Sequence, residues 1–183
     1  MRIAVLGWGS LIWNPGTLKT SEAFTPTGPR LPVEFCRISN DGRLTLVLTE
    51  DFGTRSVTYS AVSAFGDLAS AVADLRMREV TTRANIGIVD LRGDGGNAAK
   101  QRHASFVDQI SEWAVEHHYG AVIWTALESN FAERSARGEA FSTAAAVRYL
   151  EELNADQRAD ALRYIRNAPS EVQTPVLLIA TES

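Results

Sequence analysis

A glycine-rich loop near the amino terminus is the first place where this sequence could do chemistry. It comprises Gly7, Trp8, Gly9, Ser10, Leu11 and Ile12. The glycines let backbone N–H groups approach a ligand closely, so the loop could hold an anion or a carbonyl oxygen. A simple structural turn is the alternative. However, four large apolar side chains between positions 8 and 13 are typical of a loop that is pinned to the protein body and could line a pocket.

Two familiar uses of such a loop do not fit its residues. A dinucleotide-binding fingerprint needs a third glycine where Ile12 stands, and a helix where Asn14-Pro15-Gly16 follows. Ser10 as a nucleophile would need a histidine base and a Gly-x-Ser-x-Gly elbow, which its neighbours do not form. The loop is therefore a candidate for binding a substrate through its backbone.

Glu79 is the candidate proton carrier. It stands in the expected last turn of a helix, where the negative end of the helix dipole raises the pKa of a carboxyl group slightly. Residues that oppose a local structural preference, as a carboxylate does at the negative end of a helix, occur most often at functional sites. The alternative is a solvated glutamate paired with Arg76 or Arg83, which stand three residues before it and four after it.

Other reactive residue types give weaker signals. His117 and His118 would point about 100° apart on a helix. No partner lies at ligand spacing from them or from His103, so we expect no metal site. Glu34 and Glu128 adjoin strand-like apolar runs and are expected to face outward.

Composition limits the class of protein. The chain has 183 residues, of which 45% are hydrophobic and 22% charged, enough for one sizeable core. A net charge of −4 and a pI near 5.4 give no reason to expect nucleic acid or an anionic membrane as a partner. The single cysteine, Cys36, excludes an intramolecular disulfide and is expected to be a core thiol. With no leader and no long apolar run, we expect a soluble cytoplasmic protein.

Periodicity and turn signals predict the elements that must position these residues. A buried strand ahead of the loop is followed by a β-meander, with a hairpin turn at Asn40-Asp41-Gly42. The expected strands of this first third are 2–6, 31–39, 44–48 and 55–62. Asp67 is the expected N-cap of a helix that runs to about Glu79, where Val80-Thr81-Thr82 should end it.

The remainder alternates between strands and helices. We expect strands at 86–91, 121–127 and 175–181, a flexible loop from Gly93 to Asn97, and helices at about 100–118, 143–153 and 156–168. Asn154 and Gln157 form a capping box for the last of these helices. The prediction is one mixed α+β domain, with a core of about residues 1–128 and a helical C-terminal extension of about 129–183.

Three stretches taken together resemble the γ-glutamylcyclotransferase superfamily, which includes ChaC-like and AIG2-like proteins. They are the run Leu6–Gly16, the strand Arg43–Leu48 and the pair Arg78-Glu79. The first is similar to the Gly-Tyr-Gly-Ser-Leu-Ile-Trp-Asn-Pro run that opens the ChaC-like, glutathione-degrading branch. In that branch the catalytic glutamate lies in an Arg-Glu pair after a helix. The order and rough spacing agree over residues 2 to about 91, half of the chain.

The resemblance implies a fold around a small β-barrel with surrounding helices, and an enzyme that needs no metal or cofactor. It implies that Glu79 is catalytic and that the loop residues 7–12 bind the substrate. In the implied reaction, the α-amine of a γ-glutamyl group closes on its own γ-carbonyl and releases 5-oxoproline and the free amine. Tethering supplies much of the rate, and one carboxylate acts first as base and then as acid.

Two departures from the family pattern bear on the substrate. Trp8 stands where the family has tyrosine, and Val80-Thr81-Thr82 stands where the ChaC-like branch has glycines and a tyrosine. Residues beyond Gly93 match nothing in that branch and could cover the pocket or make an oligomer contact, so a homodimer stays open. We expect a small γ-glutamyl molecule as partner, with glutathione not assured. The alternatives are a catalytically silent binding module of the same fold and a γ-glutamyl amide hydrolase.

Overall fold

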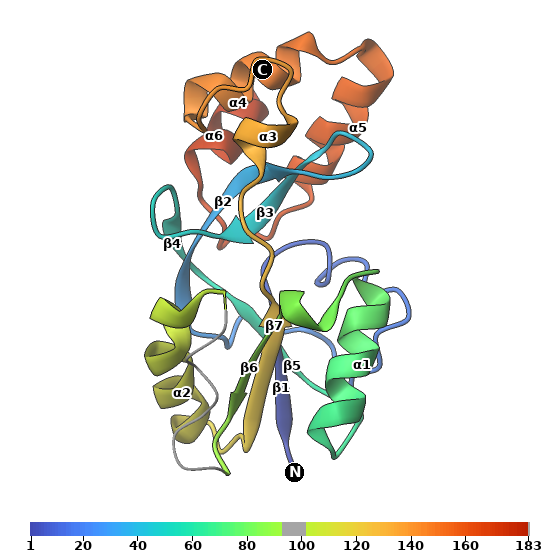
Figure 1. Ribbon diagram of the computed structural model, residues 1–183, viewed down its shortest axis with the longest axis vertical. Coiled ribbons are helices and arrows are strands. Elements are labelled where there is room, and N and C mark those ends of the chain that lie inside the picture. The colour runs from blue at the N-terminus through green and yellow to red at the C-terminus, as the bar shows by residue number, and fades with distance from the viewer. Residues whose placement is uncertain (93–101, 183) are drawn as a thin grey trace. The chain divides into compact units, whose positions relative to one another are not determined.

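The computed structural model describes residues 1–92 and 102–182 and shows a mixed α+β fold (Figure 1). The expected loop at Gly93–Asn97 lies outside the described residues. The chain divides into two compact units that interleave along the sequence. Unit 1 comprises Met1–Gly7, Leu11–Arg30 and Val57–Leu127, and unit 2 comprises Trp8–Ser10, Leu31–Ser56 and Glu128–Ser183.

Unit 1 is built on a sheet whose described strands have the order β5-β1-β7-β6. They are β1 (Ile3–Gly7), β5 (Tyr59–Val62), β6 (Ile86–Asp90) and β7 (Ala121–Thr125). β1 and β7 run parallel, whereas β5 and β6 are antiparallel to their neighbours. The carboxyl ends of β1 and β7 and the amino ends of β5 and β6 therefore lie together. We call this the loop end of the sheet, because the chain leaves β1 here.

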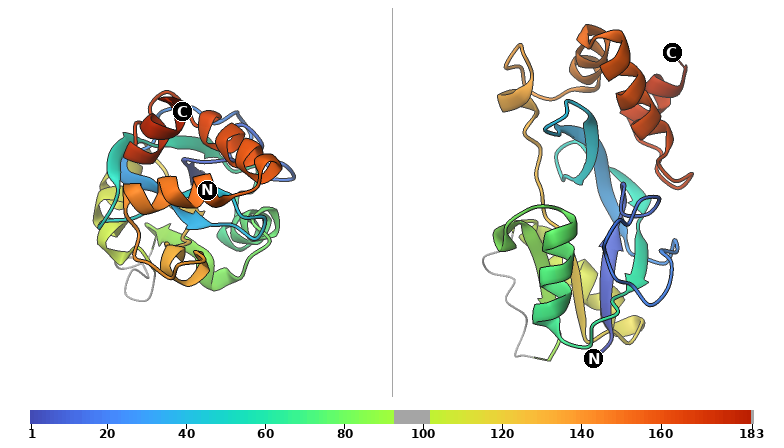
Figure 2. Two further views of the ribbon diagram at one scale, coloured as in Figure 1. Left: turned by 90° about the horizontal axis from the view of Figure 1, so that it is seen from above. Right: turned by 90° about the vertical axis from the view of Figure 1, so that its right-hand side faces the viewer.

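The helices α1 (Leu68–Arg78) and α2 (Val107–Glu116) lie on opposite faces of this sheet (Figures 1 and 2). The face that α1 covers is wholly apolar at its centre, where Val72 and Leu75 pack in one cluster with Ile3 and Ile123. Asp67 caps α1 as predicted, accepting from the Ser70 N–H at 2.8 Å. Two short 3-10 helices, η1 (Arg83–Asn85) and η3 (Ala104–Phe106), precede β6 and α2. The helix expected from about residue 100 thus begins its α-helical part only at Val107.

Unit 2 contains a sheet whose described strands have the order β3-β2-β4. They are β2 (Arg30–Ile38), β3 (Leu44–Leu48) and β4 (Thr54–Val57). The predicted hairpin joins β2 and β3, with Ile38 opposite Leu44 and Gly42 at a φ of 83°, which favours glycine. The helices of this unit are α3 (Phe131–Arg134), α4 (Thr143–Glu152), α5 (Ala155–Arg166) and α6 (Pro175–Glu182).

The small β-barrel and the β-meander expected in the first third are wrong for the part of the chain that is described. Its strands form two open sheets. The expected strand at 55–62 divides at Thr58 into β4 and β5, which belong to different sheets. Both the backbone N–H and the hydroxyl of the buried Thr58 donate to the Pro29 carbonyl oxygen, at 3.3 and 2.7 Å, which takes this residue out of the strand ladder.

The strand predicted at 175–181 is also wrong, because these residues form α6. Pro175 suits the first turn of a helix, where no N–H is needed. Thr174 precedes it and accepts from the Leu177 N–H through its hydroxyl, at 3.4 Å, and from the Leu178 N–H through its carbonyl, at 3.0 Å. No helix within the described ranges is long and apolar enough to cross a bilayer.

Candidate functional site

The loop predicted to bind substrate is anchored by its apolar side chains, since Trp8 is 5% exposed and Leu11 is 6% exposed. Gly7 is the last residue of β1, and a Cβ added there would lie 3.3 Å from the Phe24 ring. Leu11 packs in the core of unit 1, and Ile12 after it is half-buried. The loop is therefore pinned where it leaves the sheet.

The middle of the loop, Trp8–Ser10, belongs to unit 2. A Cβ added at Gly9 would lie 3.4 Å from the Tyr164 hydroxyl oxygen and 3.8 Å from the Leu46 Cβ. The backbone at Gly9 thus comes close to these side chains, which explains a small residue there. Ser10 is half-buried.

Glu79 is the C-cap of α1, and its backbone N–H donates to the Leu75 carbonyl oxygen at 3.0 Å. Its side chain is only 14% exposed, so it is not a freely solvated surface carboxylate. The Arg78 Nη1 lies 2.6 Å from the Glu79 Oε1. The ion-pair partner is thus the preceding residue, and the structure pairs Glu79 with neither Arg76 nor Arg83.

The environment of Glu79 alters its acidity. Burial raises the pKa of the Glu79 carboxyl above its ordinary value, because the charged form loses solvation. The charge and the hydrogen bond of Arg78 offset part of this rise. A carboxyl group whose pKa is moved towards neutrality is suited to taking up and returning a proton.

Arg78 also joins Glu79 to the descending part of the loop. Its Nη2 donates to the Asn14 carbonyl oxygen at 2.5 Å. In the same unit, Leu11 and Leu18 pack in the cluster that contains Leu75 of α1. The structure therefore brings Glu79 together with the segment 11–18, while Trp8, Gly9 and Ser10 of the predicted site are grouped with unit 2.

Sequence reasoning missed several polar groups at the loop end of the sheet. Asn85 Nδ2 donates to the Thr81 Oγ1 at 2.8 Å, and the Asn85 carbonyl oxygen accepts from the Ala126 N–H at 2.8 Å. The Asn85 Oδ1 and the Thr125 Oγ1 are buried and have no hydrogen-bond partner among the described residues. The only signal in the sequence was a polar residue at the boundary of each of two apolar strands.

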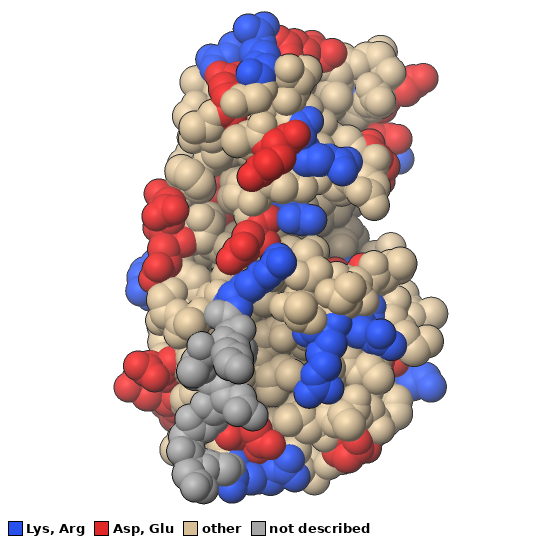
Figure 3. Space-filling view, viewed as in Figure 1, with Lys and Arg blue, Asp and Glu red and all other residues tan. Residues whose placement is uncertain are grey.

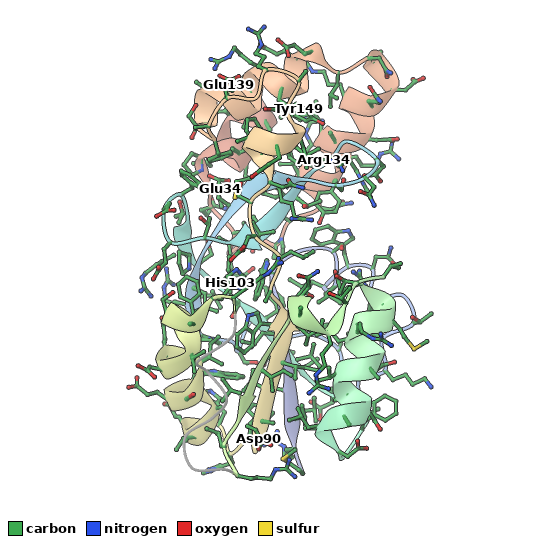
Figure 4. All side chains as sticks on the ribbon, in the orientation of Figure 1. Glu34, Asp90, His103, Arg134, Glu139 and Tyr149 are labelled. Carbon is green, nitrogen blue, oxygen red and sulfur yellow. The ribbon has the colours of Figure 1, made fainter. Side chains whose placement is uncertain are left out.

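His103 and Cys36, two other reactive side chains, are not part of an arrangement like that of Glu79, Arg78 and Asn14. His103 precedes η3 (Figure 4), and burial, with a smaller effect from Arg102, lowers its pKa to about 4, so its ring is neutral at pH 7. Cys36 is fully buried as predicted, and burial raises the pKa of its thiol to about 12. No group of three His, Cys, Asp or Glu residues within the described ranges could hold a metal ion.

Glu34 corrects a prediction. It was expected to face outward, but it lies on β2 with 1% of its surface exposed (Figure 4). Its carboxylate accepts from the Phe35 N–H at 2.7 Å, and also from the Thr174 side chain and the Val176 N–H at the start of α6. These donors explain how a carboxylate can be buried on a strand. Glu128 is exposed, as predicted.

Charged side chains of both signs are interspersed on the face of each unit that Figure 3 shows, in line with the net charge of −4.

Three comparisons with known proteins give no relative: no protein-family model, no curated protein and no solved structure matches the chain.

Proposed function

We propose that the protein is an enzyme of the γ-glutamylcyclotransferase type, with Glu79 as general acid and base. It cyclises a γ-glutamyl amine or peptide to 5-oxoproline and releases the free amine. The observation that carries the proposal is the buried Glu79 carboxylate, whose pKa is raised and whose Arg78 partner also bonds the Asn14 carbonyl oxygen.

This arrangement supports the resemblance described above. The similarity rests on the run Leu6–Gly16 and on the pair Arg78-Glu79, which are more than 60 residues apart in the chain. The hydrogen bond from Arg78 to Asn14 joins these two stretches within unit 1. Two motifs that a shared catalytic site would need close together are thus in contact.

The proposed reaction uses one proton carrier in both halves. The ionised Glu79 takes a proton from the α-ammonium group of the substrate, and the freed amine attacks the γ-carbonyl carbon to form the ring C–N bond. Glu79 then returns the proton to the departing nitrogen as the original amide C–N bond breaks. The second proton of the ring nitrogen passes to the released amine, which leaves as an ammonium ion, so that 5-oxoproline is a neutral lactam and Glu79 is ionised again. Ring closure within one molecule gives the attacking amine a large proximity advantage, and no oxidant or reductant is needed.

The loop residues 7–12 are the proposed substrate-binding element, and no metal or cofactor takes part. Trp8 and the stretch Val80-Thr81-Thr82 depart from the ChaC-like pattern, so the substrate class is a small γ-glutamyl compound of which glutathione is one candidate. The absence of a membrane-crossing helix among the described residues is compatible with the cytoplasmic location that we propose.

The test is to identify the product. The purified protein would be incubated with glutathione, γ-glutamylalanine and other γ-glutamyl amines, and 5-oxoproline and glutamate would be quantified by mass spectrometry. We expect 5-oxoproline together with an equal amount of free amine. Free glutamate in its place would indicate hydrolysis by water. No product from any member of the panel would contradict an enzymatic function and favour a binding module.

A further inference from the structure

Two buried oxygen atoms at the loop end of unit 1, the Asn85 Oδ1 and the Thr125 Oγ1, lack a hydrogen-bond partner among the described residues. A buried polar atom that is left unpaired loses its solvation without compensation. Buried polar atoms in native proteins nearly always have a partner, either protein, water or ligand. These two oxygens therefore indicate a polar partner that the described chain does not supply.

The side chain of Asn85 is held in one orientation. Its Nδ2 donates to the Thr81 Oγ1 at 2.8 Å, so the amide nitrogen is already engaged and the oxygen is the unpartnered atom. Thr81 stands two residues after Glu79, in the turn that follows α1. The amide nitrogen of Asn85 is thus bound to the segment that follows the proposed base, and its oxygen is left as an acceptor.

Thr125 lies on the same face of the sheet as α1. Side chains alternate along a strand, so Thr125 shares its face with Ile123, which packs in the cluster that contains Leu75 of α1. Thr125 is the last residue of β7 and is paired with Ile86, the residue after Asn85. It therefore stands one step beyond the apolar core, towards the loop end, where α1 ends at Glu79.

We infer that Asn85 and Thr125 form a subsite for the α-ammonium group of the substrate, an inference that rests on the proposed function. An ammonium group has three N–H donors, and the Asn85 Oδ1, the Thr125 Oγ1 and the Glu79 carboxylate are three acceptors. Only Glu79 among them takes up a proton in the ordinary pH range. The two neutral oxygens would orient the ammonium group and leave Glu79 as the acceptor of its proton.

The subsite can be tested by equilibrium binding, without turnover. L-glutamate and glutarate share two carboxylates and differ by the α-ammonium group, and neither carries an amine that cyclisation could expel. Their dissociation constants for the full chain would be measured by NMR titration. We expect the wild type to bind L-glutamate about tenfold more tightly than glutarate, or more.

Three variants test whether the Thr125 hydroxyl itself causes the preference for L-glutamate over glutarate. Thr125→Val has nearly the same shape without the hydroxyl and should reduce the preference for L-glutamate to about threefold or less. Thr125→Ser restores the hydroxyl and should restore the preference. Ser135→Ala is the matched control, because the Ser135 Oγ is also buried without a described partner but belongs to unit 2. Removing an unpartnered hydroxyl should leave the unfolding temperatures of Thr125→Val and Ser135→Ala unchanged or higher.

The possible outcomes distinguish a failure of the ammonium subsite from a failure of the proposed cyclisation. An unchanged preference in Thr125→Val would overturn the subsite, with a buried water as the partner of Thr125, even if the wild type forms 5-oxoproline. A lost preference in a protein that forms no 5-oxoproline would support the ammonium subsite and contradict the cyclisation. Binding of neither ligand to the wild type would overturn the subsite, whatever the product assay shows.

Discussion

The guanidinium of Arg78 lies 2.6 Å from the carboxylate of Glu79 and donates through its other terminal nitrogen to the Asn14 carbonyl oxygen. The two side chains of the ion pair are 13% and 14% exposed, so the pair is less screened by water than a surface salt bridge. One arginine thus both tunes the proposed base and holds the loop segment beside it.

Arg78→Met should move the acid limb of the pH dependence of kcat/KM to higher pH. Arg78 stabilises the ionised form of Glu79, so its removal raises the pKa of Glu79 further. At a given pH, a larger fraction of the enzyme then has Glu79 protonated and cannot accept the proton of the substrate. A pH profile with the best γ-glutamyl substrate measures the shift. Arg76→Met, on an exposed position of the same helix, is the control, and equal profiles for all three proteins would contradict this role of Arg78.

Glu34→Gln should flatten the pH dependence of stability. Burial raises the pKa of Glu34 above its ordinary value of 4.5, so the folded protein binds the proton more tightly than the unfolded chain. The free energy of unfolding therefore falls as the pH rises from about 4.5 through the raised pKa, by about 1.4 kcal/mol for each unit of the rise. Urea unfolding across this window tests the prediction. The exposed Glu128→Gln should keep the wild-type slope, and the same slope in Glu34→Gln would show that Glu34 does not cause it.

Val80→Gly should stabilise the protein by about 1 kcal/mol. Val80 has a φ of 48° and is 92% exposed, so a β-branched residue occupies the left-handed region with little packing in return. Denaturant unfolding gives the difference. The same substitution at Val115, which is 62% exposed within α2, should instead destabilise by about 0.5 kcal/mol, because glycine is a poorer helix former than valine. A loss of stability in Val80→Gly would refute strain at this turn.

Gly87→Ala should destabilise unit 1 by about 3 kcal/mol. A Cβ at Gly87 would lie 2.0 Å from the Cε2 of Trp124, its cross-strand neighbour, whose ring is fully buried and has no room to move. Thermal unfolding with a near-UV signal from tryptophan would report the change. Gly66→Ala is the control, since the nearest heavy atom there is 3.8 Å away. Equal stability of the two variants would mean that Trp124 can shift aside.

The sequence predicted the locally encoded elements well. Asp67 capped α1 and Glu79 ended it, and the strands β1, β3, β6 and β7 lie close to their predicted positions. Each of these segments has a signal in its own sequence, which is a helix cap, a turn or a clear periodicity of apolar residues. The predicted small β-barrel and the predicted strand at 175–181 are wrong for the opposite reason. The apolar run 175–181 is too short to distinguish a strand from a helix, and Thr58 leaves the ladder through a bond to Pro29 that no local pattern indicates.

The candidate site was also predicted only in its local parts. The loop and Glu79 came from motifs, and the Arg78 bond to Asn14 joins the segment 11–18 to Glu79. Asn85 and Thr125 are 40 residues apart in the chain, and their segments meet because the β6–β7 register pairs Ile86 with Thr125. Glu34 was misjudged because its donors come from Thr174 and Val176, far along the sequence. The surroundings of these three residues depend on contacts between segments that are distant in the sequence.

The most direct test of the central claim compares the wild type with Glu79→Gln on the γ-glutamyl substrate that the panel identifies. The two proteins should have similar unfolding temperatures, and Glu128→Gln should be fully active as a control for loss of an exposed glutamate. We expect 5-oxoproline formation by Glu79→Gln to fall by a factor of about 10² to 10⁴, since the amide cannot carry the proton. Turnover by Glu79→Gln at the wild-type rate would contradict the account.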